Sequence, residues 1–102
     1  MIEDTLQRLR NRLQNSGSLD DADRTRALEL LEQLKAEIGS LPESDQRVQS
    51  ALHKADQVAD PEVEDEGAIG ALEESILELE AAHPKASGIL SDIAFILGRM
   101  GI

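Results

Sequence analysis

The stretch PKASGILSDIAFILGR, residues 84–99, decides the fold of this 102-residue chain. Its apolar positions point almost all the way round a helix, and Pro84 suits the first helical turn. A helix that is apolar on every side is normally buried on every side. We therefore expect residues 84–99 to form a helix that lies at the centre of a bundle or in the seam between two copies of the chain.

Three earlier segments repeat the spacing of an amphipathic helix, with apolar residues stepping by three and four positions. The first covers residues 2–15 and ends at a turn that contains Gly17. The second begins at Asp20, which is suited to be its N-cap, and ends at Gly39. The third runs up to His83 and carries Ile69, Leu72, Ile76 and Leu79 on one face. These patterns predict three helices before the last one.

Residues 44–59 predict a further helix with a thinner apolar face. Ser44 is suited to cap this helix, and the sequence Asp60-Pro61 ends it. Its apolar face consists of Val48, Leu52, Ala55 and Ala59.

Together the segments predict an all-α fold. We expect one helical domain over residues 1–102, built as a small antiparallel bundle of four to five helices, with an acidic loop at about residues 60–66. A long C-terminal hairpin formed by the last two helices is one form of this arrangement. Leu, Ile, Val and Phe number 27, enough for one small core.

The charge of the chain excludes several kinds of partner. The formal net charge is −11, and residues 60–82 contain nine acids and no base. Nucleic acid and anionic membrane surfaces are both bound by basic surfaces, so we expect neither as a partner. An acidic surface of this kind would instead attract a basic protein.

Neither a secretion signal nor a membrane span is expected. The first residues, Met1-Ile-Glu-Asp, lack a basic region followed by an apolar run. The most apolar stretch, residues 89–102, is too short to cross a bilayer and contains Asp92 and Arg99. The chain has no Cys, which fits a reducing compartment. We therefore expect a cytoplasmic protein.

The last third of the chain resembles a known family. The segments that carry the resemblance are residues 72–80, the pair His83-Pro84, residues 89–97 and the terminal Met100-Gly101-Ile102. They are similar to a family of small bacterial helical proteins catalogued as a domain of unknown function. That family has an aromatic residue at the position of Leu79. The resemblance implies a bacterial cytosolic helical protein and brings no activity, cofactor or ligand with it.

An acidic pattern around residue 62 has the spacing of a calcium-binding loop. Glu62, Glu64, Glu66 and Glu73 occupy loop positions 1, 3, 5 and 12, and Gly67 occupies position 6. Glu is longer than the Asp or Asn that the first three positions favour, and Pro61 breaks the incoming helix. We therefore favour a solvated acidic linker, with a weak calcium site as the alternative, and we expect no cofactor.

No pattern of catalytic residues is present, and we expect no enzyme activity. None of the serines lies in the Gly-x-Ser-x-Gly motif of a nucleophile elbow. His83 is expected to cap the turn before Pro84, and zinc would need two or three further ligands beside it. Arg8, Arg10 and Arg12 form a short basic run that we interpret as a solvated helix face.

Two binding functions remain. The first is self-association, as a homodimer, through the apolar last helix. The residues expected at that interface are Ile89, Ile93, Ile96, Leu97 and Met100. The alternative is an acidic adaptor or inhibitor that binds a basic protein through residues 60–82.

Overall fold

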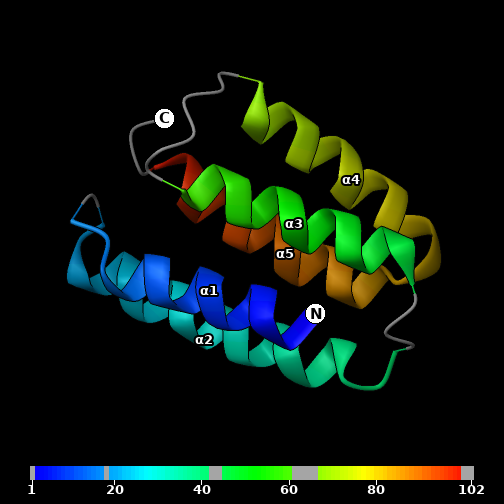
Figure 1. The fold of residues 1–102 in the computed structure, drawn as a ribbon, viewed down its shortest axis with the longest axis horizontal. Coiled ribbons are helices and arrows are strands. Elements are labelled where there is room, and N and C mark those ends of the chain that lie inside the picture. Colours follow the sequence, from blue (N-terminus) through cyan, green and yellow to red (C-terminus); the bar gives the residue numbers. More distant parts are fainter. Residues whose placement is uncertain (1, 18, 42–44, 61–66, 100–102) are drawn as a thin grey trace.

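The computed structural model describes residues 2–17, 19–41, 45–60 and 67–99. Within these ranges the chain forms five helices and no strand (Figure 1). They are α1 (Ile2–Gln14), α2 (Asp21–Ile38), α3 (Gln46–Ala59), α4 (Ala68–Ala82) and α5 (Pro84–Gly98). The predicted all-α bundle is confirmed, and its helices begin and end close to the expected residues.

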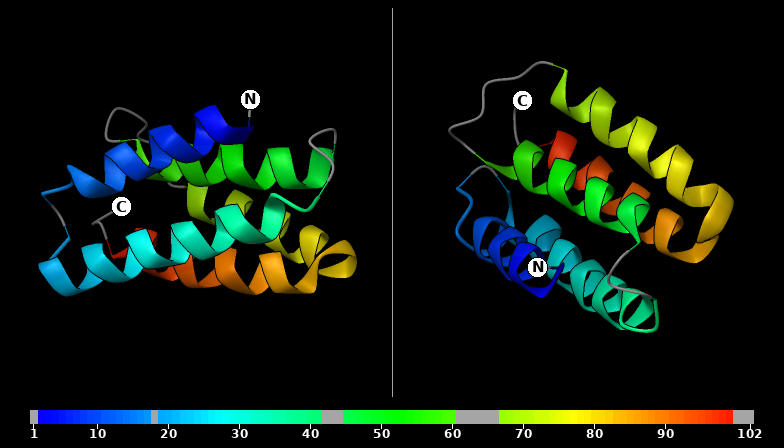
Figure 2. Two further views of the ribbon diagram at one scale, coloured as in Figure 1. Left: turned by 90° about the horizontal axis from the view of Figure 1, so that it is seen from below. Right: turned by 45° about the vertical axis from the view of Figure 1, so that its right-hand side comes forward.

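The five helices close into a ring. α1 packs against α2, α2 against α5, α5 against α4, α4 against α3, and α3 returns to α1. In the view of Figure 1, α4 lies above α3, α5 runs behind α3, and the α1–α2 hairpin lies below them; the left view of Figure 2 shows α1 and α3 along one side and α2 and α5 along the other. Since every helix has a neighbour on each side, every helix can bury an apolar face.

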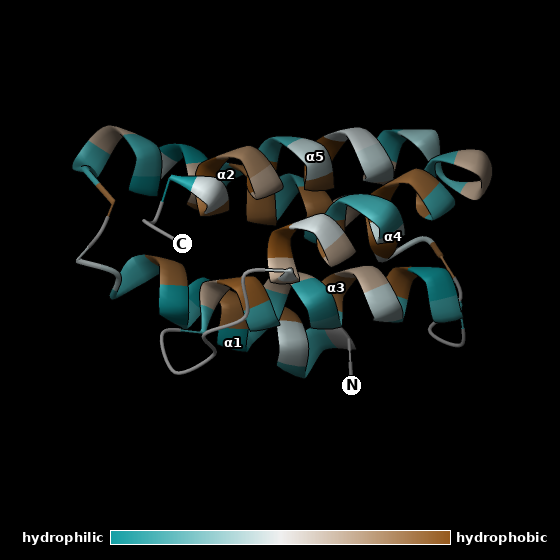
Figure 3. Cartoon of the chain, turned by 90° about the horizontal axis from the view of Figure 1, so that it is seen from above, coloured by the Kyte–Doolittle hydropathy of each residue, from teal (hydrophilic) through white to brown (hydrophobic). Residues whose placement is uncertain are grey.

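The inward faces form one hydrophobic core. Apolar stretches turn toward the space between the helices, and charged stretches turn outward (Figure 3). The largest side chains that are fully buried come from all five helices: Leu9, Leu13, Leu34, Leu52, Leu72, Leu79, Leu90, Ile93 and Leu97, with the smaller Val48 and Val58. The apolar faces expected from the helical spacing are the faces that meet in this core.

The starts of α2 and α3 show how local chemistry sets the helix boundaries. Asp20 is the N-cap of α2, as predicted, and its side chain accepts a hydrogen bond of 2.7 Å from the backbone N–H of Asp23. The N-cap of α3 is Asp45, whose carboxylate accepts hydrogen bonds from the N–H groups of Arg47 and Val48. The predicted cap, Ser44, lies outside the described residues.

The last helix does not lie at the centre of the bundle, so the first of the two expected placements was wrong; the second, a seam between two copies, stays a prediction. α5 contacts α2, α4 and α3, but the side chain of Phe95 on its outer side is 64% exposed. The helices are arranged in a ring around a shared core, so each of them keeps an outer side. None of the described helices is long and apolar enough to cross a membrane.

The exposed glycine inside α5 allows a direct test of the helix geometry. A Cβ atom added at Gly88 would meet nothing within 4 Å, and alanine is favoured over glycine inside helices. We expect Gly88→Ala to raise the free energy of unfolding by about 0.5–1 kcal/mol, measured by urea denaturation followed by circular dichroism.

Gly39→Ala is the matched control for that measurement. A Cβ atom at Gly39, the C-cap of α2, would lie 3.1 Å from the carbonyl oxygen of Lys35. We therefore expect a smaller gain, or none. Equal gains at both positions would contradict the described packing around Gly39.

Candidate functional site

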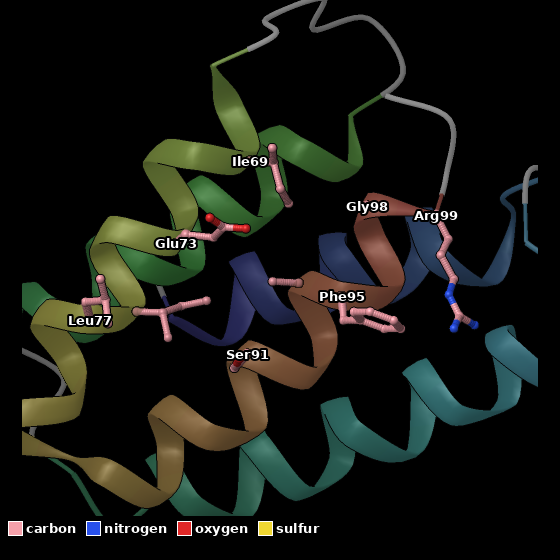
Figure 4. A pocket seen from close by; sticks show the side chains of 9 residues that line it. Ile69, Glu73, Leu77, Ser91, Phe95, Gly98 and Arg99 are labelled. Carbon is pink, nitrogen blue, oxygen red and sulfur yellow. The ribbon is translucent and has the colours of Figure 1, made fainter.

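An open groove runs along the outer side of the α4–α5 hairpin. Its volume is about 620 Å³ (Figure 4). The two helices are antiparallel and joined only by His83, so the groove is bounded along its length by one wall from each helix. The wall from α4 consists of Ile69, Glu73, Ile76 and Leu77.

The wall from α5 combines small residues with one large aromatic ring. Ser91, Ala94 and Gly98 recur at steps of three and four, which places them on one face of the helix. Because these side chains are short, they leave a hollow beside α4. A Cβ atom added at Gly98 would meet nothing within 4 Å, so this end of the hollow is open.

Two large apolar side chains border this hollow. Leu77 of α4 is 65% exposed and Phe95 of α5 is 64% exposed, and both line the groove. They come from opposite walls (Figure 4). Large apolar side chains that gather around a hollow on an otherwise charged protein are typical of a binding surface.

An arginine lies at the same end of the groove as Gly98. The guanidinium of Arg99 lies 4.6 Å from the centre of the Phe95 ring, within the range of a cation–π interaction. The same guanidinium donates to both carboxylate oxygens of Asp23, at 3.0 and 3.3 Å. Since Asp23 lies in the first turn of α2, these contacts hold Phe95 and Arg99 in place from a second helix.

The residues predicted for a dimer interface do not form an exposed surface. Ile93, Ile96 and Leu97 lie in the core of a single chain. Ile89 is half-buried against that core, and Met100 lies outside the described residues. The sequence shows that these side chains are apolar, but helical spacing could not show which side of α5 faces α2 and α4. The exposed apolar residues of the groove that sequence analysis missed as binding residues are Leu77 and Phe95.

The predicted calcium loop falls mostly outside the described residues. Glu62, Glu64 and Glu66 belong to the part of the chain that the structure leaves undescribed, whereas Glu73 lies on α4 and lines the groove. Among the described residues, no group of three or more His, Asp or Glu side chains is placed to hold a metal ion. The calcium site therefore stays a prediction that the structure does not test.

His83 links the α4–α5 turn to the start of α3. It follows the last residue of α4 and precedes the first residue of α5, so it caps both helices. Its Nε2 lies 2.7 Å from Oδ2 of Asp45. The hydrogen bond from His83, supported by those from two backbone N–H groups, holds the pKa of the Asp45 carboxyl below its ordinary value.

The three arginines of the basic run in α1 all form ion pairs. Arg8 Nε and Arg12 Nε lie 3.6 and 3.2 Å from the carboxylate of Asp56 on α3. Arg12 also reaches Asp60 at 2.8 Å, and Arg10 pairs with Glu32 on α2 at 3.1 Å. Two of these arginines therefore join α1 to α3 and the third joins α1 to α2. These contacts indicate a structural role rather than an anion site.

One lysine–serine pair has the chemistry of a nucleophile beside a base. Lys54 Nζ of α3 donates a hydrogen bond of 2.8 Å to Oγ of Ser75 on α4. Ser75 is only 2% exposed, between α3 and α4, so a substrate cannot reach its hydroxyl in this structure. The pair fastens α3 to α4.

The fold and the groove define a small all-α protein with one open apolar surface on its C-terminal hairpin. The chain belongs to the family described as a domain of unknown function (DUF4404), which matches residues 2–102. The predicted membership of a family of unknown function is thereby confirmed, whereas the C-terminal motif that carried the resemblance is not tested by this match. No curated protein and no solved structure matches the chain.

The cluster around Asp56 provides a stability test. The Asp56 side chain is only 10% exposed, and neutralising it leaves the half-buried Arg12 with one carboxylate instead of two. We expect Asp56→Asn to lower the free energy of unfolding by about 1–3 kcal/mol. Arg10→Ala removes an exposed pair and should cost less than about 1 kcal/mol. Equal losses in urea denaturation would contradict this ranking.

The contact between His83 and Asp45 predicts a dependence on acid pH. A carboxyl whose pKa is lowered by folding adds stability above its unfolded pKa and loses it as the pH falls through the folded pKa. Asp45→Asn keeps an acceptor for the cap but has no carboxyl to titrate. We expect the variant to be less stable than the wild type near neutral pH.

The two proteins should converge in stability as the medium is acidified below about pH 4. Urea denaturation at a series of pH values measures the difference. A difference that stays constant down to acid pH would show that the carboxylate of Asp45 does not stabilise the fold.

Proposed function

We propose that this chain is a non-catalytic interaction protein that binds an amphipathic helix of a partner protein in the α4–α5 groove. The observation that carries the proposal is the placement of Leu77 and Phe95. These two large, exposed apolar side chains lie on opposite walls of one hollow. A partner that fills the hollow would bury both of them at once.

The shape of the groove favours a helix as the occupant. Two antiparallel helices form its walls, and the side chains of a third helix can pack between them in the way that helices pack in a bundle. Apolar anchors at positions i, i+3 or i+4 and i+7 would meet the hollow. The stretch from Ile69 to Leu77 is about 12 Å long at 1.5 Å per residue, which corresponds to about two turns of such a helix.

The polar groups at the groove support binding rather than catalysis. Glu73 and Arg99 are the ionisable side chains that line it, and Arg99 is engaged by Asp23 and by the Phe95 ring. Ser91 also lines the groove, but none of the described lining residues is a histidine or lysine that could act as its base.

Self-association is the second candidate function, because the same exposed side chains could meet in a two-fold pair. The surface would then be the outer side of α4 and α5, with Leu77 and Phe95 at its centre, and not the buried face of α5. Light scattering on a sizing column separates the two candidates: a solution mass of two chains supports the homodimer and a mass of one chain leaves the groove open.

A peptide probe, together with a substitution that fills the groove, tests the proposal. The probe is a neutral amphipathic peptide of about twelve residues, with Leu at i, i+3, i+4 and i+7 and Ala or Gln elsewhere. Amide shifts in NMR spectra of the full chain should change along α4 and α5. We expect Gly98→Leu to weaken binding at least about ten-fold, because the new side chain occupies the hollow.

Gly88→Leu is the matched control. It makes the same substitution on the same helix at an exposed position that does not line the groove, and it also meets no atom within 4 Å at its Cβ. Binding should be unchanged. Shifts that spread over α1 and α2, or equal binding by both variants, would contradict a docking site in this groove.

A further inference from the structure

The two walls of the groove differ in charge. α4 contains Glu73, Glu74, Glu78 and Glu80 and has no Lys or Arg. α5 contains one acid and one base, so its charges balance. A segment that lies in the groove therefore meets apolar side chains beneath it and negative charge along the side formed by α4.

Two of the α4 carboxylates are placed to meet such a segment. Glu73 lines the groove itself. Leu77 and Glu80 follow it by four and seven residues, which places all three on one face of α4. All three side chains are exposed. Within the described part of the chain, neither of these two carboxylates has an ion-pair partner, so both are available to a ligand.

The base at the end of the groove does not cancel this negative charge. Arg99 is paired with Asp23, and its guanidinium lies over the Phe95 ring. Glu73 and Glu80, in contrast, extend from a helix that carries acids alone. The net field along the α4 wall is therefore negative.

A second copy of the chain matches this field poorly. Each copy has a formal net charge of −11. A two-fold pairing of groove against groove would also bring two such negatively charged surfaces together. Repulsion between like charges disfavours that arrangement, whereas a positively charged helix would be attracted to the same wall.

We propose that the occupant of the groove is a basic amphipathic helix of another protein. Its apolar anchors would pack between Leu77 and Phe95, and its Lys or Arg side chains would lie on the side that faces Glu73 and Glu80. The inference rests on the proposed function and adds to it the charge of the partner and the side on which that charge lies.

Three peptides with one shared apolar face test the charge of the partner. Each carries Leu at i, i+3, i+4 and i+7, and the positions flanking that face are Lys, Gln or Glu. We expect the Lys peptide to bind the full chain about three- to ten-fold more tightly than the Gln peptide, and the Glu peptide to bind more weakly than both. The Lys advantage should shrink at high salt, because exposed ion pairs are screened.

A pair of charge-matched variants locates the effect. Glu73→Gln with Glu80→Gln removes the two carboxylates on the groove side of α4. Glu3→Gln with Glu29→Gln removes two exposed carboxylates from α1 and α2, so the net charge changes equally. We expect the first variant to lose the preference for the Lys peptide and the second to retain it.

The possible outcomes separate the inference from the proposed function. Equal binding of all three peptides, still blocked by Gly98→Leu, would overturn the charge preference and leave the groove as a docking site. Equal losses in the two charge-matched variants would show attraction by net charge alone and would overturn the inference. Failure of every peptide to bind would overturn both proposals. A dimer that Gly98→Leu dissociates would overturn the inference, because a second copy would be the occupant.

Discussion

The packing of α5 against α2 holds the two ends of the chain together. Most neighbouring helices in the ring are close in sequence, but this contact joins the α1–α2 hairpin to the α4–α5 hairpin. It buries Leu90, Ile93 and Leu97 of α5 in the common core with Leu30 and Leu34 of α2. Without it the core would lie open along one side, and the N-terminal hairpin would contact the rest only through α1 and α3. The ion pair between Arg99 and Asp23 lies at the end of this contact and adds a polar restraint to an apolar one.

The high negative charge of the chain is compatible with this core because the charges and the apolar residues lie on different faces. Most carboxylates are exposed, where water screens their repulsion. Among the carboxylates that the structure describes, Asp56 is the buried exception, and two arginines compensate it. The same need explains why Arg8 and Arg12 of α1 point at α3: a buried carboxylate without a partner would oppose folding.

Helical spacing was enough to predict the fold, because α1 to α4 each have one apolar face. The stripe of α2 and the cap at Asp20 are local features, and both were predicted correctly. The segment of α3 also forms a helix, although its apolar face has few large side chains. Its buried residues Ala51, Ala55 and Ala59 are small enough to let the helix pack closely against its neighbours. What spacing could not supply was the direction in which a nearly all-apolar helix faces. In α5, Ile93 and Ile96 are buried and Phe95 is exposed because of where α2 and α4 lie.

The candidate site was predictable only in part for the same reason. The acidic character of α4 is visible in the sequence, and so is the apolar character of α5. The contact between His83 and Asp45, which are 38 residues apart, depends on tertiary structure. The groove also depends on tertiary structure. It forms only where the short side chains of Ser91, Ala94 and Gly98 lie beside α4.

The groove has a cost in stability, and this cost is an argument that the groove is used. Leu77 and Phe95 remain about two-thirds exposed, and burying the rest of each would supply roughly 1–2 kcal/mol. Larger residues at Ser91 or Gly98 could fill part of the hollow, and at Gly98 the space for a side chain is open. Of the large apolar residues that the structure describes, two lie mostly on the surface, and both border the same hollow beside an acidic helix. Scattered exposed residues would need no explanation, but two that converge on one groove are explained best by a partner that covers them.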